Sequence, residues 1–347
     1  MLKLIDHIVR ISARRDRTEI NTALVEALLD LFGPQSLRIY RCFSSGPKTI
    51  IFACAGFGQE GIFSRNAYLP QRNFCRPLEH DAQLRKAYRE NSIALDVLPD
   101  GENRLIFPVS SMDRPTHLID IVISENFSSI QRELLTGLID YFTHHIALLD
   151  YGETDTLTGL ANRKTFDKHL FEVLGKASND ESYYQSSTQR RRKGVHGGQH
   201  WLAVCDIDHF KLINDRHGHL IGDEVLVMFA QLMRESFRYD DQIFRFGGEE
   251  FVAVLQPATQ TNVHTIFERF RETVESHVFS RVGYVTVSIG YSQLLANDTP
   301  PDVIDRADEA LYYTKHHGRN QTACFENLLA EGKILAKSTA KGEIELF

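Results

Sequence analysis

The chain has 347 residues, a formal net charge of −7, 42% hydrophobic residues and 24% charged residues. This composition is typical of globular proteins, and the length predicts about two domains. The acidic balance gives no general attraction for nucleic acid or anionic membranes. The five scattered cysteines form no CxxC pair, so they indicate neither a zinc site nor a disulfide framework, and they favour free thiols in a reducing compartment.

The N-terminal segment MLKLIDHIVRISARRDR has only a short apolar stretch, which His7, Arg10 and Arg14 interrupt. It matches neither a signal peptide nor a membrane span. No other stretch approaches ~18 uninterrupted apolar residues. We therefore predict a cytoplasmic protein with no membrane partner.

Residues 1–150 are predicted to form a first, α+β domain. Two helical patterns open the chain, and the second follows a cap at Thr18 and stops at Gly33 and Pro34. Strand-like runs then begin at Leu37, Thr49, Arg104 and Leu118, around a polar region, residues 57–102, that is interpreted as mostly loop. Helices flanking an antiparallel sheet are the expected architecture.

A long helix is predicted to start at Ser128 and to join the two domains. Its apolar residues recur at helical spacing: Ile130, Leu134, Leu135, Leu138, Ile139, Phe142, Ile146 and Leu149. Such a stripe suits pairing with the same helix of a second copy. It equally suits packing onto the sheet of its own domain, and the sequence leaves both alternatives open.

Residues 151–325 are predicted to form the second domain, followed by a C-terminal tail, residues 326–347. A helix is expected from Arg163 to about Leu174, and residues 178–200 are interpreted as a flexible polar insertion. The RRRK run in this insertion, residues 190–193, can contact phosphates, but a solvated loop is the favoured reading and no nucleic-acid partner is predicted. After it, the predicted order is strand, helix, hairpin, helix, strand, helix.

Two acidic residues close the strand that begins the second part of this domain. Asp206 and Asp208 follow the apolar run from Trp201. Residues two apart in a strand face the same side, so both carboxylates could converge on a hard cation. The alternative is that both are capping residues in an edge loop.

The stretch FRFGGEEFVAV, residues 244–254, predicts a hairpin whose turn contains Gly247 and Gly248. If this hairpin pairs beside the strand from Trp201 to Asp208, Glu249 lies near Asp206. A few carboxylates, completed by phosphate oxygens, are the usual ligands of Mg²⁺ in proteins. The hairpin therefore favours the metal interpretation.

The second domain resembles the GGDEF diguanylate cyclases. The resemblance covers residue 155 to about residue 321 and rests on five motifs in order: DTLTGLANR, DIDHFKLINDRHGHLIGD, GGEEF, VTVSIG and RADEALYYTKHHGRN. It implies a nucleotidyl-cyclase, palm-like fold and the condensation of two GTP into cyclic di-GMP with release of two diphosphates. It also implies a homodimer, because each copy holds one GTP.

The resemblance assigns roles by position. Metal ligands for Mg²⁺ or Mn²⁺ would be Asp206, Ile207 through its carbonyl, Glu249 and Glu250, with Glu249 also the candidate general base. Asn214, Asp223 and His219 match nucleotide-reading positions, while Phe210, Lys211, Lys315 and Arg319 would contact the rest of GTP, with Lys211 also assisting catalysis. Lys315 and Arg319 were expected at positions i and i+4 of one helix end. Arg238, Asp241 and Arg269 match an RxxD site at which cyclic di-GMP inhibits the enzyme.

The first domain resembles GAF-type sensory domains in size, element order and exit helix, without a diagnostic motif, so this is a fold-level analogy that names no ligand. A competing hypothesis for the whole chain is a receptor that binds cyclic di-GMP or GTP without catalysis. The intact acidic motif favours the enzyme.

Overall fold

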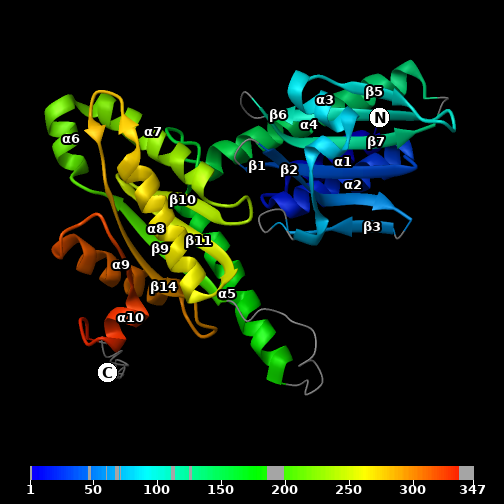
Figure 1. Ribbon diagram of the computed structural model, residues 1–347. Coiled ribbons are helices and arrows are strands. Elements are labelled where there is room, and N and C mark those ends of the chain that lie inside the picture. The colour runs from blue at the N-terminus through cyan, green and yellow to red at the C-terminus, as the bar shows by residue number, and fades with distance from the viewer. Residues whose placement is uncertain are drawn as a thin grey trace, which may run out of the picture. The chain divides into compact units, whose positions relative to one another are not determined.

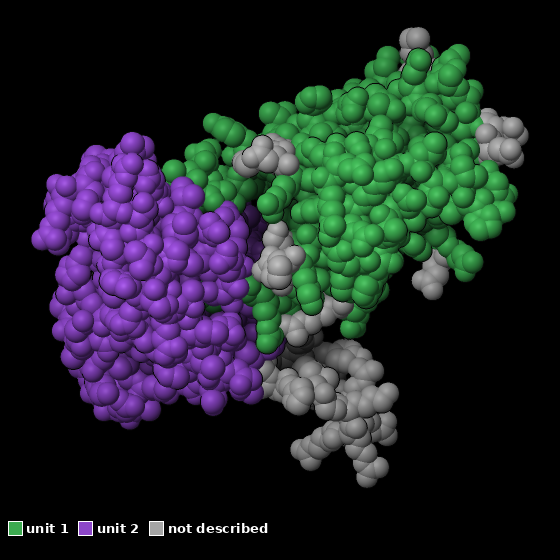
Figure 2. Space-filling model, turned by 45° about the horizontal axis from the view of Figure 1, so that its top comes forward, with its two compact units in different colours: residues 1–159, 237–240 green, residues 160–236, 241–347 purple. Residues whose placement is uncertain are grey.

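The computed structural model describes residues 2–45, 48–59, 61–66, 70, 72–110, 114–124, 127–185 and 199–335. The chain forms two compact units, coloured separately in Figure 2. Unit 1 comprises residues 1–159 and 237–240, and unit 2 comprises residues 160–236 and 241–347. Within the part of the chain that is described, no helix combines the length and apolarity needed to cross a membrane.

Unit 1 contains four α-helices and a seven-stranded sheet among the described residues (Figure 1). The helices are α1 (Leu2–Ser12), α2 (Arg17–Phe32), α3 (Ala82–Glu90) and α4 (Ser129–Glu153). The strands are β1 (Ser36–Ser45), β2 (Lys48–Gly58), β3 (Gly61–Ser64), β4 (Cys75–Pro77), β5 (Ala94–Val97), β6 (Asn103–Ser110) and β7 (Pro115–Ile123). Two short 3₁₀ turns, Arg72–Phe74 and Leu78–His80, flank β4.

The sheet of unit 1 runs in the order β3-β2-β1-β7-β6-β5, with β4 paired to β2, and all its pairs are antiparallel. Alternate residues of its strands face α1, α2 and α4, and this side forms the main core of the unit. Helix α3 covers the other face through a smaller core around Leu84 and Ala87. The α+β architecture with flanking helices is therefore as the sequence predicted.

The region 57–102 differs from the loop predicted for it. Its described residues contain β3, β4, α3 and β5. Asp81 caps α3 by accepting from the backbone N–H groups of Gln83 and Leu84. The strands are only three or four residues long, so an alternating pattern had little length in which to appear.

Helix α4 begins with a capping box in which Ser128 and Gln131 bond each other's backbone. Five apolar side chains of α4 are buried in the main core of unit 1: Leu135, Leu138, Ile139, Phe142 and Ile146. Packing onto its own sheet, one of the two alternatives for this helix, is thus confirmed. Two members of the predicted stripe, Ile130 and Leu134, are exposed instead.

Unit 2 contains a six-stranded sheet among its described residues, in the order β15-β14-β9-β11-β10-β8 (Figure 1). Its strands are β8 (Ala161–Asn162), β9 (Gln199–Ile207), β10 (Gln242–Gly247), β11 (Glu250–Ala258), β14 (Val287–Gln293) and β15 (Thr322–Cys324), with a separate hairpin of β12 (Val278–Phe279) and β13 (Gly283–Tyr284). The helices are α5 (Arg163–Gln185), α6 (Phe210–His217), α7 (His219–Ser236), α8 (Gln260–Ser276), α9 (Pro300–His316) and α10 (Phe325–Ala330).

Helices cover both faces of this sheet. On one face, Phe229 of α7 packs on Phe251 of β11 and on Phe270 of α8. On the other face, α9 packs directly on β14 at Gly290. A Cβ atom at Gly290 would lie only 2.2 and 2.1 Å from the backbone of Ala307 and Leu311, so the two elements could not approach this closely with any other residue there. The absence of a side chain at Gly290 therefore sets how closely α9 approaches the central strands.

Helix α5 is longer than the predicted helix, which was expected to end near Leu174. The described backbone remains helical to Gln185, and β9 begins at Gln199. Residues 186–198, which include the RRRK run and most of the predicted insertion, lie outside the described residues. Of the predicted tail, α10 and the residues to 335 are described, and residues 336–347 are not.

A buried ionic cluster ties the start of α2 to the last turn of α4. Arg17 is almost fully buried; its Nη2 donates to Asp150 and its Nε donates to Glu153 Oε2 at 2.6 Å. His117 of β7 is also fully buried, and its Nε2 has no hydrogen-bond partner among the described residues. Burial lowers the pKa of His117 to about 3, with the charges of Arg17 and Arg41 acting in the same direction.

Unit 1 should therefore lose stability in acid through His117. In the unfolded chain this histidine titrates near pH ~6.5, so below that pH only the unfolded state binds the proton. The stability is fully present above pH ~6.5 and falls by up to ~1.4 kcal/mol per pH unit down to about pH 3. His117→Leu should remove about 2 kcal/mol of the wild-type loss between pH 7 and pH 5. Urea unfolding at both pH values, monitored by hydrogen exchange of peptides from unit 1, would measure this difference. Equal losses of stability in the wild type and in His117→Leu would contradict the prediction.

Candidate active site

The candidate site of unit 2 lies at the end of its central strand, β9. This strand pairs antiparallel with β14 on one side and with β11 on the other. The register sets Asp206 opposite Glu250 of β11 and opposite Ser288 of β14. The predicted hairpin thus pairs beside the strand that ends in carboxylates.

The hairpin between β10 and β11 presents the acidic pair. Gly247 pairs with Glu250, so Gly248 and Glu249 form a two-residue turn. Gly248 has a φ of 49°, in the left-handed region that suits glycine in such turns. Arg245 holds the turn, because its Nε and Nη2 donate to the carbonyl oxygen of Gly248 at 3.1 and 2.9 Å.

Asp206 has an unusual environment for a carboxylate. It is only 5% exposed, and Lys315 of α9 lies with its Nζ 2.7 Å from Asp206 Oδ2. Burial raises the pKa of the Asp206 carboxyl above its ordinary value; the charges of Glu249 and Asp208 also raise it, and Lys315 opposes them. The acidic turn is therefore close enough to act on Asp206 electrostatically, and the negative charge there is poorly compensated.

Asp208 does not join Asp206 in a pair of free carboxylates. It is buried beyond the end of β9, where it accepts from Thr286 Oγ1 at 2.8 Å, from Ser288 Oγ at 2.7 Å and from the backbone N–H of Asn320 at 3.0 Å. These bonds fill most of its acceptor capacity. Asp208 therefore has a structural role, but not in an edge loop: it fastens the central strand β9 to β14 and to the segment after α9.

The donor set at the end of β9 fits a hard divalent cation that also binds a phosphorylated ligand. Among the described residues, no three His, Cys, Asp or Glu side chains gather into a complete metal site. Two carboxylates, Asp206 and Glu249, together with the carbonyl of Ile207, would supply part of an oxygen shell. Mg²⁺ commonly binds in this way, with substrate phosphates and water as the remaining ligands.

The residues after β9 form α6 and α7, of which only the second was predicted as a helix. His209 has a φ of 59°, and the chain passes from β9 into α6 through two residues, Asp208 and His209. Phe210, buried, and Lys211, exposed, are the first two residues of α6 and follow Asp206 closely. Gly218, with a φ of 83°, then separates α6 from α7.

Asn214 of α6 lies against α7 at Gly222. A Cβ at Gly222 would come within 2.0 Å of Asn214 Oδ1, so any side chain there must displace the amide. Asp223 is the next residue and is exposed, as is His219 at the start of α7. The structure thus brings Asn214 near Asp223 through a contact at Gly222, a residue within the motif GHLIGD that the sequence analysis did not single out.

The end of α9 differs from the prediction that Lys315 and Arg319 are i and i+4 on one helix. The helix ends at His316, and Gly318 takes a φ of 115°, which stops the helix. Arg319 and Asn320 follow with φ of 61° and 48°. Arg319 is therefore exposed in a turn rather than stacked one helical turn after Lys315.

That turn is held from two sides. Asn320 donates its backbone N–H to Asp208, and its side chain bonds Glu275 and Arg271 of α8 at 2.7 and 2.9 Å. Consecutive left-handed residues other than glycine cost of order 1–3 kcal/mol each and persist where surrounding contacts hold them. The hydrogen bonds of Asn320 to Asp208, Glu275 and Arg271 hold this turn in its left-handed conformation.

The three residues of the predicted inhibitory site lie in segments that belong to both compact units. Arg238 is exposed and falls in the short segment grouped with unit 1, whereas Asp241 is buried in unit 2, where it accepts from the backbone N–H of Gln256 at 3.1 Å. Arg269 is exposed on α8 and donates to the carbonyl of Ser236 at 2.8 Å. The Arg269 side chain is therefore held at Ser236, which precedes Arg238 by two residues in the sequence.

Comparison with known families finds a match over unit 2. The profile described as "Diguanylate cyclase, GGDEF domain" matches residues 153–321. Because the match begins at residue 153, it leaves the N-terminal residues unassigned.

Individual proteins agree with the profile. The chain is 40% identical over 172 residues to diguanylate cyclase DgcP of Pseudomonas aeruginosa, which covers 48% of this chain and 23% of that protein. It is 32% identical over 169 residues to diguanylate cyclase DgcS of Shewanella oneidensis, covering 48% of this chain and 50% of that protein. The chain thus spans half or less of the length of these two relatives.

A solved structure is also similar to part of the chain. It is the GGDEF domain of DgcB from Caulobacter crescentus in complex with c-di-GMP, at 34% identity and a TM-score of 0.44. The alignment covers 50% of this chain and 96% of that one.

Proposed function

We propose that this protein, whose residues 153–321 form a GGDEF domain of the diguanylate cyclase type, condenses two GTP molecules into cyclic di-GMP and two diphosphates. One observation carries the proposal: the buried Asp206, the acidic turn at Glu249 and the Lys315 ammonium meet at the end of β9. Two acidic groups and a cation around one point suit the handling of a nucleoside triphosphate and its metal.

Mg²⁺ or Mn²⁺ would be held by Asp206, Glu249 and the carbonyl of Ile207, with Glu250 nearby in the hairpin. The poorly compensated charge at Asp206 supports this, because a bound cation would relieve it. When bound, such an ion supplies Lewis-acid stabilisation of phosphoryl charge and favours ionisation of a ribose hydroxyl.

The remaining roles follow from the chemistry of each side chain. Asn214 and Asp223 offer an amide and a carboxylate to the Watson–Crick edge of guanine, and His219 lies at the start of the same helix. Phe210, Lys211, Lys315 and Arg319 would bind the triphosphate, the last through a forked guanidinium. Lys315 would then exchange Asp206 for phosphate oxygens, and Glu249 would accept the proton of the attacking 3′-hydroxyl.

Two copies must act together, because each site holds one GTP and each 3′-hydroxyl attacks the α-phosphorus of the other nucleotide. We propose a twofold homodimer for this reason. We also propose that unit 1 is a GAF-like sensory domain that regulates the reaction, on the grounds of its flanked antiparallel sheet. Since GTP is a cytoplasmic nucleotide, the reaction would take place in the cytoplasm.

Cyclic di-GMP is proposed to inhibit the enzyme through Arg238, Asp241 and Arg269. The spacing of Arg238 and Asp241 supports this, as does the bond that brings Arg269 to the end of α7. Exposed guanidinium groups such as those of Arg238 and Arg269 are suited to a dinucleotide with two phosphates.

Replacement of Glu249 by Gln tests the reaction itself. Purified wild-type protein with GTP and Mg²⁺ should form cyclic di-GMP, and Glu249→Gln should lower the rate by at least ~100-fold, because a general base and a metal ligand are both lost. The exposed Glu331→Gln is the matched control and should keep the wild-type rate. A folded, dimeric wild type that binds GTP but forms no product would identify a receptor instead of an enzyme.

Gly222→Ala tests the guanine site without removing a polar group. The new methyl group must push Asn214 aside, so KM for GTP should rise about tenfold, equivalent to ~1.4 kcal/mol, with a smaller change in kcat. Gly175→Ala in α5 is the control, since a Cβ there meets nothing within 4 Å. Equal KM values for Gly222→Ala and the wild type would remove Asn214 from the site.

Arg238→Ala tests product inhibition. The initial rate in the absence of product should be unchanged, while the concentration of added cyclic di-GMP needed for half-inhibition should rise at least ~10-fold, because a charge-assisted contact is lost. The measurement is a dose–response with protein freed of bound dinucleotide. Undiminished inhibition of the variant would refute the assignment.

A further inference from the structure

Arg319 stands in a backbone conformation that an arginine rarely adopts. Its φ is 61° and that of Asn320 is 48°, both in the left-handed region, where residues other than glycine and asparagine are uncommon. Such strain is kept where the surrounding structure holds it, and it is concentrated at functional sites. The Arg319 side chain is exposed, so burial in a core does not offset the cost. The turn must therefore be held by other contacts, and its guanidinium is open to a ligand.

The backbone of this turn is attached to two elements of the candidate site. Arg319 donates its N–H to the carbonyl oxygen of Thr314 in α9 at 2.9 Å. The side-chain amide of Gln321 donates to the same carbonyl oxygen at 3.2 Å. Asn320 donates its N–H to Asp208 Oδ2 at 3.0 Å. These bonds join the turn to the end of α9 and to the residue that follows β9.

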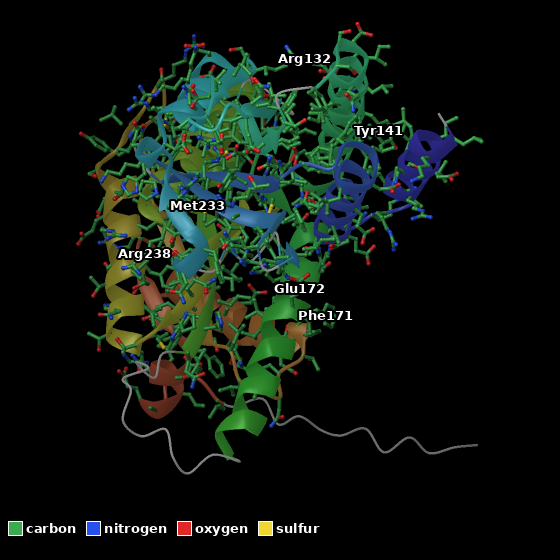
Figure 3. All side chains as sticks on the ribbon, turned by 90° about the vertical axis from the view of Figure 1, so that its right-hand side faces the viewer. Arg132, Tyr141, Phe171, Glu172, Met233 and Arg238 are labelled. Carbon is green, nitrogen blue, oxygen red and sulfur yellow. The ribbon has the colours of Figure 1, made fainter. Side chains whose placement is uncertain are left out.

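Helix α8, the yellow helix at the left of Figure 3, provides a further attachment. Its apolar side is buried in unit 2 through Val263, Phe267, Phe270 and Val274. Beside this buried side, five polar residues spaced by three or four positions all bond the segment of residues 320–327: Gln260, His264, Glu268, Arg271 and Glu275. The helix is thus joined to β15 and to the turn before it by about one residue in each helical turn.

The last step of this polar row closes a ring of three hydrogen bonds. Arg271 Nη1 donates to Asn320 Oδ1 at 2.9 Å, and Asn320 Nδ2 donates to Glu275 Oε1 at 2.7 Å. Arg271 Nη1 also donates to Glu275 Oε2 at 2.6 Å. Both ends of the Asn320 amide are therefore bonded, which fixes the orientation of that side chain. Because the Arg271 side chain is only 13% exposed, the ring is less screened by water and salt than an ordinary surface pair.

We propose that Arg271 of α8 is a positioning residue for the reaction: through Asn320 it holds the turn from which Arg319 presents its guanidinium to the triphosphate of GTP. The inference rests on the proposed function, in which Arg319 binds the triphosphate, and adds a residue outside the site that sets the strength of this contact. A forked guanidinium bonds phosphate oxygens well only in a defined orientation. Without the ring, Arg319 and Asn320 would relax toward right-handed or extended conformations, and the Arg319 side chain would leave in another direction.

The alternative role of the ring is only to fasten β15 to α8. The same polar row offers a comparison for this alternative, because Thr322 donates its hydroxyl to Glu268 Oε1 at 2.6 Å. That bond joins α8 to β15 and not to the turn of Arg319. If fastening were the whole role of the ring, loss of the Thr322 bond would weaken nucleotide binding as much as loss of the ring.

Equilibrium binding of a GTP analogue to the full chain tests the role without requiring the reaction. The analogue carries a methylene group between its α- and β-phosphorus atoms, so the bond that the reaction breaks cannot be cleaved. With Mg²⁺ present, Arg271→Gln should raise the dissociation constant about tenfold, because a charge-assisted phosphate contact is weakened. Thr322→Val is the matched control and should leave the constant within about twofold of the wild-type value.

A double-mutant cycle with Arg319→Ala separates positioning from a general change of charge. If Arg271 acts through Arg319, Arg271→Gln should change the dissociation constant by less than about twofold once the Arg319 guanidinium is gone. Repulsion by the glutamates that Arg271 neutralises would instead persist in the Arg319→Ala background. An undiminished tenfold effect there would overturn the proposal.

Asn320→Gly tests the same link from the other side. Glycine suits the left-handed region and keeps the N–H that Asp208 accepts, but it removes the ring. It should weaken binding of the analogue about as much as Arg271→Gln does, and it decides the question if Arg271→Gln fails to fold. Wild-type affinity in Asn320→Gly, or a tenfold loss in Thr322→Val, would overturn the positioning role.

The outcomes also separate this role from the proposed reaction. A wild type that binds the analogue and shows these differences, but forms no cyclic di-GMP from GTP, would support the positioning role and refute the reaction. A wild type that forms cyclic di-GMP, while Arg319→Ala binds the analogue as tightly as the wild type, would overturn the positioning role and leave the reaction standing.

Discussion

The antiparallel pairing of β9 with β11 is the constraint on which the candidate site depends. Its register sets Asp206 opposite Glu250 and so fixes the acidic turn beside the end of the central strand. A slip of one residue would turn every side chain of one strand to the other face of the sheet. The slip is opposed by apolar side chains that are buried along both strands, from Trp201 to Ile207 and from Phe251 to Leu255.

This pairing concentrates negative charge at a place where water is scarce. The buried Asp206 is balanced in part by Lys315, and Glu249 adds to the charge. A stable fold would gain more from an apolar residue at such a position than from a buried carboxylate that is only partly compensated. A bound cation and its phosphorylated ligand would supply the positive charge that Asp206 and Glu249 lack. The acidic site therefore supports the proposed reaction.

Asp208 shows how the surrounding structure supports that end of the sheet. By accepting from Thr286, Ser288 and Asn320, it joins β9 to β14 and to the turn that follows α9. That turn carries Arg319 in a left-handed conformation, so one buried carboxylate helps to position a guanidinium far along the chain. In unit 1, Arg17 has a comparable role, since it fixes the last turn of α4, where the match to the GGDEF profile begins, to the start of α2.

The sequence by itself determined the elements with strong local signals. The hairpin at Gly247 and Gly248, the capped helix from Ser128 and the apolar strand that contains Asp206 were predictable, because turn glycines, caps and periodic burial act over a few residues. The five motifs likewise predicted the match to the GGDEF profile over residues 153–321. The short elements between residues 57 and 102 escaped prediction because three or four residues give no readable period.

Only the tertiary structure decided what depends on contacts between distant segments. It separated Asp208 from Asp206, since the partners of Asp208 come from residues 286, 288 and 320. It placed Arg319 beyond the end of α9 and showed that Asn214 and Gly222 touch. It also divided the apolar positions of α4 into buried ones, such as Phe142, and exposed ones, such as Leu134, because burial is set by which neighbours a face meets and not by its composition.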